Sequence, residues 1–430
     1  MNYINKVKIK GFWGDKTVLI SFGQNENFLI GVNGSGKTTI INLIAAVVDV
    51  NFPTLDRTQF ESITIYLSST EKHTGKYRIS VRKEENENTP YKNILYTIYK
   101  GNKLDFEVYL DDLVEERYFR HPDLDKMRLL NLRNERAHSK DLTGYLSRLF
   151  NVSWLSIHRI NNNKKKRENR THDSLVDQKL NQFNSNFNGY ISELNRQAKN
   201  ETDKFQKFIF LSLLSTETQS LLAQTLDKIE LKKEKQDLAK VYSLFGLQMS
   251  DYQKDLKDYA KAFETAYSRF KDPDITITFG DADYLIGMKR IHSVIQEWKS
   301  LLEKQNEIFE YRDKFMSIIN GLLQRKSLII NDRNELRVQT QSGKEFDLNF
   351  LSSGEKQLVI IFGETLLQKS EPHIFIADEP ELSLHIEWQE KLVSSLKLLN
   401  PFAQLIFATH SPDIVSSFQK SVIQIENSIS

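Results

Sequence analysis

A glycine-rich stretch near the start of the chain has the residue types and spacing that bind phosphate. In FLIGVNGSGKTTIINLI, Gly31, Gly36, Lys37 and Thr38 fit the pattern G-x-x-x-x-G-K-[ST]. The glycines of such a loop let the backbone wrap around phosphates, the lysine reaches the β- and γ-phosphates, and the hydroxyl holds Mg²⁺. The stretch therefore predicts a nucleotide site. Its candidate binding residues are Asn33, Gly34, Ser35, Gly36, Lys37, Thr38 and Thr39.

Two adjacent acids follow an apolar run in HIFIADEPELSLH. Ile374 to Ala377 are typical of a strand buried on both faces of a parallel sheet, and Asp378 and Glu379 come directly after them. Ligands bind beyond the carboxyl ends of such strands. We expect Asp378 to support Mg²⁺ and Glu379 to orient and deprotonate an attacking water. Taken alone, the same residues also fit a solvated acidic turn broken by a proline.

A histidine ends a third apolar strand. QLIFATHSP predicts a strand over Leu405 to Thr409, followed by His410. A neutral imidazole donates one hydrogen bond and accepts another, which suits a side chain that touches both a γ-phosphate and a water molecule. We therefore take His410 as a catalytic candidate beside Glu379, with a purely structural histidine as the alternative.

The string LSSGEKQ, residues 351–357, opens a predicted helix with two serines and a glycine. Serine side chains cap helix N-termini, and helix N-termini also favour anions. The string alone fits both roles. The candidate phosphate-binding residues are Ser352, Ser353, Gly354 and Glu355.

The elements that must position these groups fit an α/β head. Asn27 to Ile30 predict a buried strand before the glycine-rich loop, and Thr39 to Val48 an apolar helix after it. The start MNYINKVKIKGFWG alternates like an edge strand. Four alternating segments predict an antiparallel side sheet: Ser62 to Leu67, Tyr77 to Val81, Ile94 to Tyr99 and Phe106 to Leu110.

A long insertion separates the two halves of this head, because about 315 residues lie between Lys37 and Ser352. Between Pro122 and Pro372 the only proline is Pro273, which favours long helices. Two stretches repeat apolar residues in coiled-coil steps, with Gln305 and Arg312 interrupting the second. The seams are Val176, Leu180, Phe183, Phe187, Tyr190 and Leu194, then Ile291, Val294, Trp298, Leu301, Ile308, Phe315, Ile319 and Leu322.

These seams predict antiparallel, outward-projecting helical arms, with a compact helical bundle packed on the head as the alternative. The expected organisation is a first part of the head over residues 1–171, a helical insertion over 172–326, and a second part of the head over 327–430.

The order of P-loop, LSSGE, a strand ending in DE and a strand ending in TH resembles the ABC-type ATPases. The phrases FLIGVNGSGKTTIINLIAA, LSSGEKQ and DEPELSLH, with the long insertion, are similar to the SMC, RecF and OLD-like branch. Within it they resemble ATPase subunits of bacterial anti-phage systems, of the PARIS type more than the Septu type. The match covers about the first 50 and last 100 residues. It implies an ABC-type P-loop ATPase head with an antiparallel side sheet and a coiled-coil-like helical insertion.

The resemblance also implies ATP and Mg²⁺ as ligands, and assembly through the ATP sites. In that family the signature segment, here Ser352, Ser353 and Gly354, would cap the γ-phosphate held by a partner's P-loop, so the working unit would be a homodimer or a higher homo-oligomer. Two departures stand out. No glutamine matches the family's Q-loop, and only His158 and Arg159, after a predicted strand from Val152 to Ile157, are candidates. His385 stands where transporters carry an aspartate.

Composition narrows the class of protein. A net charge of +2 gives no global attraction to nucleic acid, although the segment from Arg159 to Arg170 carries six basic residues and one acid. That segment fits a solvated loop, or a contact with DNA or an acidic viral protein. The chain has no cysteine, which excludes a cysteine zinc hook. No apolar run approaches the length of a membrane span and no signal-peptide core is present, so we expect a cytoplasmic protein.

Three functions remain from the sequence. The leading one is an ATP-hydrolysing sensor or scaffold that controls a separate effector, a TOPRIM or HNH nuclease, in defence against phage. The second is a RecF-like DNA-repair ATPase acting directly on DNA, and weak basicity argues against it. The third is the nucleotide-binding subunit of a transporter, and the long insertion argues against it. After His410 we expect only a helix near Ser411 to Gln419 and a strand over Val422 to Ile425, so a nuclease must come from a second chain.

Overall fold

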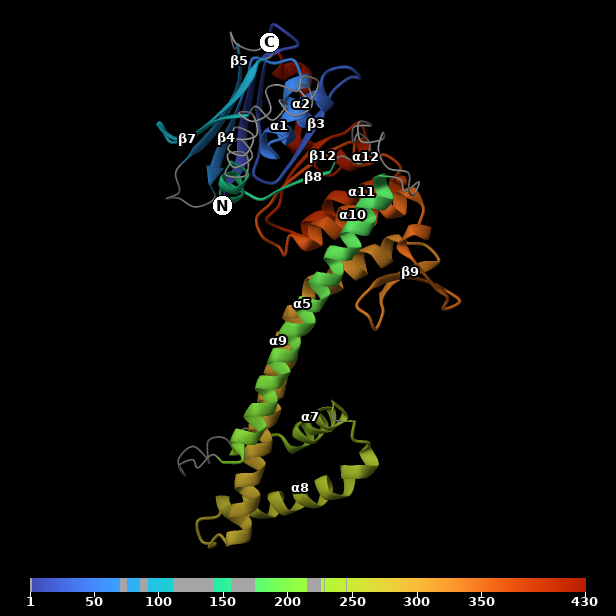
Figure 1. Cartoon of the computed structure of the whole chain (residues 1–430). Helices are drawn as coiled ribbons and strands as arrows, with labels where there is room; N and C mark the ends of the chain where they lie inside the picture. The colour runs from blue at the N-terminus through green and yellow to red at the C-terminus, as the bar shows by residue number, and fades with distance from the viewer. Residues whose placement is uncertain are drawn as a thin grey trace, which may run out of the picture. The chain divides into compact units, whose positions relative to one another are not determined.

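The computed structural model describes residues 2–69, 76–85, 92–110, 142–155, 175–214, 226–227, 229–244 and 246–430 (Figure 1). The chain divides into two units: Met1–Asn188 with Tyr311–Ser430, and Gly189–Glu310. Both boundaries fall inside long helices, α5 (Leu175–Ser212) and α9 (Phe279–Leu322). The expected insertion, residues 172–326, begins just before α5 and ends just after α9. The first unit is larger than the expected head because it includes the helix ends that pack on it.

A five-stranded parallel sheet lies at the centre of the first unit. Its order is β14-β3-β13-β12-β8, so β13 lies between the strand before the P-loop and the strand before the acids. The bounds are β3 Glu26–Ile30, β8 Val152–Leu155, β12 Ile374–Asp378, β13 Gln404–Ala408 and β14 Val422–Gln424. These strands confirm the five expected from apolar runs, with ends that agree to within one residue, except that the expected end of β8, at Ile157, lies outside the described residues. The order brings three candidate groups to neighbouring strand ends.

A six-stranded antiparallel sheet forms the second layer, in the order β2-β1-β4-β5-β6-β7. The bounds are β1 Asn2–Phe12, β2 Lys16–Ser21, β4 Ser62–Ser69, β5 Tyr77–Glu84, β6 Asn93–Lys100 and β7 Lys103–Leu110. The expected side sheet is confirmed, but the expectation of β1 as an edge strand is wrong. Positive φ angles at Gly11, Trp13 and Gly14 turn the chain back, so that β2 pairs outside β1 and takes the edge.

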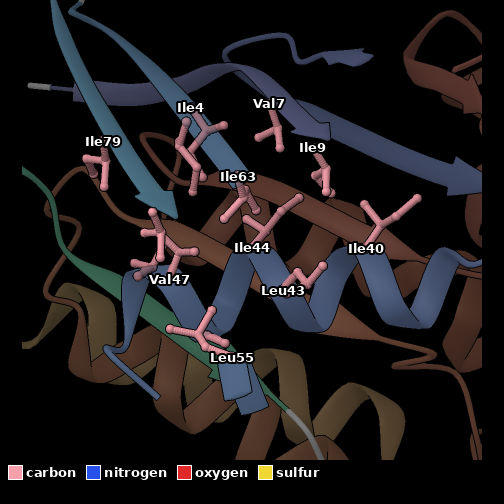
Figure 2. Close-up of a cluster of buried hydrophobic side chains, with 14 of the residues drawn as sticks. Ile4, Val7, Ile9, Ile40, Leu43, Ile44, Val47, Leu55, Ile63 and Ile79 are labelled. Carbon is pink, nitrogen blue, oxygen red and sulfur yellow. The ribbon is translucent and has the colours of Figure 1, made fainter. Parts of the chain in front are cut away.

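Helix α1 (Lys37–Val48) packs between the two sheets. Figure 2 shows Ile40, Ile44 and Val47 of α1 facing the isoleucines of the antiparallel sheet, among them Ile9 and Ile63. The same buried cluster continues to the parallel sheet through β12 and β13. Each such side chain contributes about 1.5–3 kcal/mol when it is fully buried. This packing fixes the helix that begins within the P-loop. The short α2 (Phe52–Arg57) follows α1.

The rest of the first unit carries the second half of the site. A small sheet of β9 (Lys326–Ile330), β10 (Leu336–Thr340) and β11 (Glu345–Phe346) leads through η3 (Leu348–Phe350) into α10 (Ser353–Leu367). The remaining helices are α11 Ile386–Leu399, α12 Pro412–Val415, η4 Gln419–Ser421 and η5 Ile425–Ser428, and residues 142–149 are also helical. Where one helix was expected over 411–419, the chain forms the single turn of α12 and then η4.

In the second unit, α7 (Leu231–Leu244) and α8 (Met249–Lys271) join the inner parts of α5 and α9. Helices α5 and α9 lie side by side (Figure 1). Phe183 packs on Phe315 in the first unit, and Gln305 donates to the Thr202 hydroxyl at 3.2 Å in the second. Residue numbers rise along one helix as they fall along the other, so the pair is antiparallel. The polar Gln305 thus meets a polar partner in the seam.

No helix among the described residues is both long and apolar enough to cross a lipid bilayer. The basic segment from Arg159 to Arg170, and with it His158, lies outside the described residues.

Candidate functional site

The P-loop begins where β3 ends, and its shape depends on glycine. Gly34 and Gly36 have φ of 84° and 95°, in the left-handed region. A Cβ at Gly36 would also lie 2.9 Å from Cζ of Phe12, so no larger residue fits. The Lys37 side chain is only 5% exposed and its Nζ donates to the carbonyl oxygens of Gly31 at 2.8 Å and Val32 at 3.1 Å. The loop therefore holds its ammonium group at the strand end.

Burial and nearby carboxylates shift the pKa of Lys37 in opposite directions. Burial lowers the pKa of Lys37 below its ordinary value, and the nearby carboxylates of Glu426, Glu379 and Asp378 oppose that shift. Glu426 in η5 accepts a hydrogen bond from the Val32 N–H at 2.7 Å. Backbone N–H groups, first its own and then that of Val32, hold the pKa of Glu426 below its usual range. Three carboxylates thus face a cation that phosphates would also approach.

The candidate magnesium ligands lie together. The Thr38 hydroxyl donates to Oδ1 of Asp378 at 3.2 Å, although the two residues are 340 positions apart. One hydroxyl and one carboxylate fit Mg²⁺, which keeps several waters and completes its shell with substrate phosphates. The buried Ser35 hydroxyl has no hydrogen-bond partner among the described residues, which also fits a loop that receives phosphate.

Glu379 and His410 face each other across neighbouring strand ends. Nε2 of His410 lies 3.9 Å from Oε1 of Glu379, and the side chains are 40% and 26% exposed, so both remain accessible to a substrate. The backbone N–H of Glu379 donates to the Ala408 carbonyl at 2.8 Å, which extends the pairing of β12 and β13 past the end of β12. Glu379 also has a φ of 49°, a conformation that a glutamate rarely adopts.

The LSSGE segment forms the start of α10. Ser352 is the N-cap and makes a capping box with Glu355, whose Oε2 accepts from the Ser352 backbone N–H at 2.9 Å and pairs with Lys326 at 2.8 Å. Burial acts to raise the pKa of Glu355, but Lys326 and Ser352 outweigh it and hold that pKa below the usual range. Ser353 is the first residue of the helix. A Cβ at Gly354 would lie 2.4 Å from the Ser383 carbonyl oxygen, so glycine is required there.

The structure thus brings Lys37, Thr38, Asp378, Glu379 and His410 to one edge of the parallel sheet. It does not bring the LSSGE segment to them. Among the described residues, the hydrogen bonds, ion pair and close approach of residues 352–355 involve no P-loop residue.

Sequence reasoning missed Trp13 as a site residue. Its ring is 44% exposed, stacks on Phe12 at 4.6 Å between centroids, and would lie 3.1 Å from a Cβ placed at Gly36. An exposed aromatic face beside a P-loop can stack on a nucleotide base. The only signal in the sequence was an aromatic residue between two glycines, Gly11 and Gly14, in the first predicted strand.

A cavity of about 750 Å³ adjoins the site between the start of the P-loop and the His410 loop. Its lining includes Gly31, Val32 and Glu426, together with Thr409 and His410.

Fold and site together define an ABC-type P-loop ATPase head of the SMC and RecF-like kind. The chain belongs to the AAA ATPase domain family AAA_15, whose model matches residues 2–415.

Two curated relatives are similar in sequence. The Septu protein PtuA of Bacillus thuringiensis is 26% identical over 248 residues, which cover 54% of this chain and 61% of that protein. The Retron Vc95 probable ATPase of Vibrio cholerae serotype O1 biovar El Tor is 25% identical over 201 residues, which cover 41% of this chain and 38% of that protein. The matches thus span less than two thirds of either relative.

Solved structures of similar fold include an Smc head domain with an extended coiled coil from Pyrococcus furiosus, bound to the C-terminal domain of ScpA. It is 16% identical with a TM-score of 0.40, and the match covers 97% of this chain and 92% of that chain. Another is an Smc head bound to the C-terminal winged-helix domain of ScpA, 14% identical with a TM-score of 0.42 and coverage of 96% and 92%.

Proposed function

We propose that the chain binds ATP with Mg²⁺ and hydrolyses it. The observation that carries this proposal is the approach of Glu379 to His410, 3.9 Å apart, on the same sheet edge as Lys37 and the pair Thr38 and Asp378. Lys37 binds the β- and γ-phosphates, Glu379 takes the proton from the attacking water, and His410 contacts the γ-phosphate side of that water. Thr38 and Asp378 would hold Mg²⁺, which would neutralise charge on the phosphates when bound.

The ATP site is completed by a second copy of the chain. Two observations support this part of the proposal: Ser352 and Ser353 open α10, and the next two residues contact β9 through Glu355 and the turn at Ser383 through Gly354 rather than the P-loop. A helix N-terminus favours an anion, such as a γ-phosphate presented by another protomer. Hydrolysis would therefore require a homodimer at least.

The ATPase cycle controls a separate effector in defence against phage. The support comes from the two curated relatives, a Septu protein and a retron ATPase, together with motifs that resemble anti-phage ATPase subunits. The effector we expect is a TOPRIM or HNH nuclease on a second chain. ATP binding and release would close and open the dimer to which that effector docks.

The proposal is tested by purifying the chain with and without the protein encoded beside it. The chain alone should hydrolyse MgATP, and Lys37→Ala should lose both nucleotide binding and hydrolysis. Cleavage of DNA or RNA with Mg²⁺ or Mn²⁺ should appear only with the neighbouring protein and change with Lys37→Ala. Cleavage by the lone chain, through repeated purification, would contradict the division of labour, and a neighbouring membrane permease would contradict the defence function.

Direct DNA binding is a second candidate, because one described surface favours it. The outer face of the antiparallel sheet has a groove of about 430 Å³ lined by Lys8, Lys10, Arg78 and Arg82, with one acid, Glu61. Serine, threonine and tyrosine side chains lie between these cations. Cations with hydroxyl groups are the side chains that contact phosphate backbones.

Salt dependence tests this candidate. Four phosphate contacts on duplex DNA predict that the logarithm of the binding constant falls with the logarithm of the salt concentration with a slope of about −3.6. The double variant Lys8→Ala, Arg82→Ala should reduce that slope by about 2, whereas Lys391→Ala, Lys420→Ala removes the same charge elsewhere and should leave it unchanged. Equal effects of both double variants would assign the binding to overall charge.

A further inference from the structure

Glu381 is a buried carboxylate that the hydrolysis reaction does not use directly. It lies two residues after Glu379 and is only 7% exposed. Its Oε1 accepts hydrogen bonds from three consecutive residues of the loop after β13: the Thr409 hydroxyl at 2.6 Å, the His410 backbone N–H at 2.9 Å and the Ser411 backbone N–H at 3.2 Å. One oxygen of one side chain therefore holds the whole loop that carries His410.

The burial of Glu381 is not explained by an ion pair. Among the described residues no lysine, arginine or histidine side chain pairs with its carboxylate, and its second oxygen, Oε2, is buried without a hydrogen-bond partner. Burying an ionisable group costs free energy unless its hydrogen bonds compensate. The three hydrogen bonds to Oε1 are therefore the interactions that keep this carboxylate buried. Charge-assisted bonds to backbone N–H groups are strong and directional, which suits fixing a loop conformation.

The turn that carries Glu381 is itself held from two other sides. The Gln357 side chain of α10 donates to the Pro380 carbonyl at 2.8 Å, and the Glu379 backbone N–H donates to the Ala408 carbonyl at 2.8 Å. The Leu384 N–H closes the turn on the Glu381 carbonyl at 2.9 Å. Glu381 thus extends from a turn that is hydrogen-bonded to both α10 and β13.

We propose that Glu381 is a positioning residue for hydrolysis: it holds the His410 loop so that the imidazole faces Glu379. The proposal rests on the ATPase function proposed above. The hydrogen bond from His410 to Glu381 comes from the backbone N–H, so Glu381 acts by fixing the position of the loop. Removing the Glu381 side chain should let the His410 loop move, so that the imidazole no longer lies where the γ-phosphate binds. The P-loop and Lys37 should stay in place.

The test is a double-mutant cycle between Glu381 and His410 in the full-length chain. The variants are Glu381→Ala, Glu381→Gln, His410→Ala and the two combinations with His410→Ala. Glu390→Ala, on the exposed face of α11, is the matched control. MgATP hydrolysis gives kcat and KM, a fluorescent ATP analogue gives binding, and thermal melting reports folding.

We expect Glu381→Ala to lower kcat on the order of tenfold to a hundredfold, as misplacement of a catalytic group by about 1 Å does, with nucleotide binding unchanged. Glu381→Gln keeps one acceptor oxygen and should retain an intermediate rate. In the His410→Ala background neither change should lower the rate further, because Glu381 acts through that histidine. If Glu381→Ala melts early, the Glu381→Gln cycle carries the test.

Two results would overturn the proposal. One is a wild-type kcat in Glu381→Ala, and the other is a combined variant whose loss equals the product of the single losses. Both differ from failure of the ATPase function itself, in which the unmodified chain would not hydrolyse MgATP at all.

Discussion

Glu379 reaches His410 from a backbone conformation with φ 49°, and the residue after it is Pro380. Residues held in such sparsely populated regions persist where the surroundings fix them, and they cluster at functional sites. Here the fixing contact is the hydrogen bond to the Ala408 carbonyl. The cost of this conformation is consistent with the role of general base that we assign to the residue.

Glu379→Gln should therefore keep ATP binding and lose hydrolysis. The amide has the same shape but cannot take a proton from water, and Thr38 and Asp378 remain to hold Mg²⁺. We expect a fall in the single-turnover rate of about 10²–10⁴-fold, with nucleotide affinity unchanged. Glu387→Gln, an exposed position on α11, serves as control. Hydrolysis at the unmodified rate would remove Glu379 from the role of base.

His373 gives the first unit a stability that depends on pH. Its Nε2 lies 2.7 Å from the Ser153 hydroxyl at the β8–β12 edge, and burial lowers the pKa of His373 to about 4. The unfolded chain takes up this proton near pH 6.5, so between pH 6.5 and 4 the unfolded state binds more protons. The stabilising contribution is complete above pH 6.5 and is lost as pH falls towards 4.

We expect His373→Gln to remove about 2 kcal/mol of the fall in unfolding free energy between pH 7.5 and pH 5. Urea unfolding at the two pH values measures it. His385→Gln, at an exposed position, is the matched control. A pH dependence that is the same in His373→Gln as in the unmodified chain would mean that this ring is already charged in the folded state.

At the scale of elements, α10 packs closely against α5. A Cβ at Gly363 of α10 would lie 2.2 Å from Cε2 of Phe183, and Phe183 in turn packs against Phe187 and Phe315. Asp177 of α5 also pairs with Lys356 of α10 at 2.7 Å. The helix that begins at the signature segment is thus seated directly on the bases of the paired helices.

Gly363→Val should destabilise the chain by about 1–3 kcal/mol, because the added methyl groups overlap the Phe183 ring. Adding Phe183→Leu should recover part of that loss. Gly321→Ala is the matched control: it lies in α9 with nothing within 4 Å of the added Cβ, and should stabilise by up to about 1 kcal/mol. Chemical unfolding measures all four proteins. No recovery in the double variant would show that the Phe183 ring is not what opposes the side chain.

Most strands of the two large sheets were predictable because each is a short apolar or alternating run, but β2 was not predicted. The placement of the candidate groups at one sheet edge followed from the motifs that end those runs. The edge position of β1 was mispredicted, since the turn at Trp13 depends on φ angles that periodicity does not encode. Glu381 was not singled out because its three donors lie almost thirty residues further along the chain. Gly363 was missed for the same reason, because its neighbour Phe183 belongs to the insertion.

At the scale of the whole molecule, the signature segment and the P-loop should act on the same ATP from different copies. Ser352→Arg places a bulky charge where a partner's γ-phosphate must approach, and Lys37→Ala removes the phosphate-binding lysine. Each variant alone should lose hydrolysis. After subunit exchange, each heterodimer has one site with both residues intact, so an equal mixture should regain about a quarter of the unmodified activity.

The control mixture combines Lys37→Ala with Glu379→Gln. Both residues serve the same protomer's half of the site, so no heterodimer has an intact site and activity should stay low. Exchange is verified by differently tagged copies. Absence of recovery in the first mixture, with exchange demonstrated, would place the signature in the same protomer as its P-loop or outside the site.

In this topology the ribosome synthesises β3 long before the two strands that pair with it. The side chain of Gln404 binds the backbone of Ile4 with two hydrogen bonds, 400 positions away, and among the described strands β3 pairs with β13 and β14. At about 5–20 residues per second, the P-loop strand waits roughly 20–80 s with both edges open. Exposed strand edges invite wrong pairing. A nascent chain of this protein should therefore depend on chaperones, and it can acquire its ATP site only after β13 and β14 have left the ribosome.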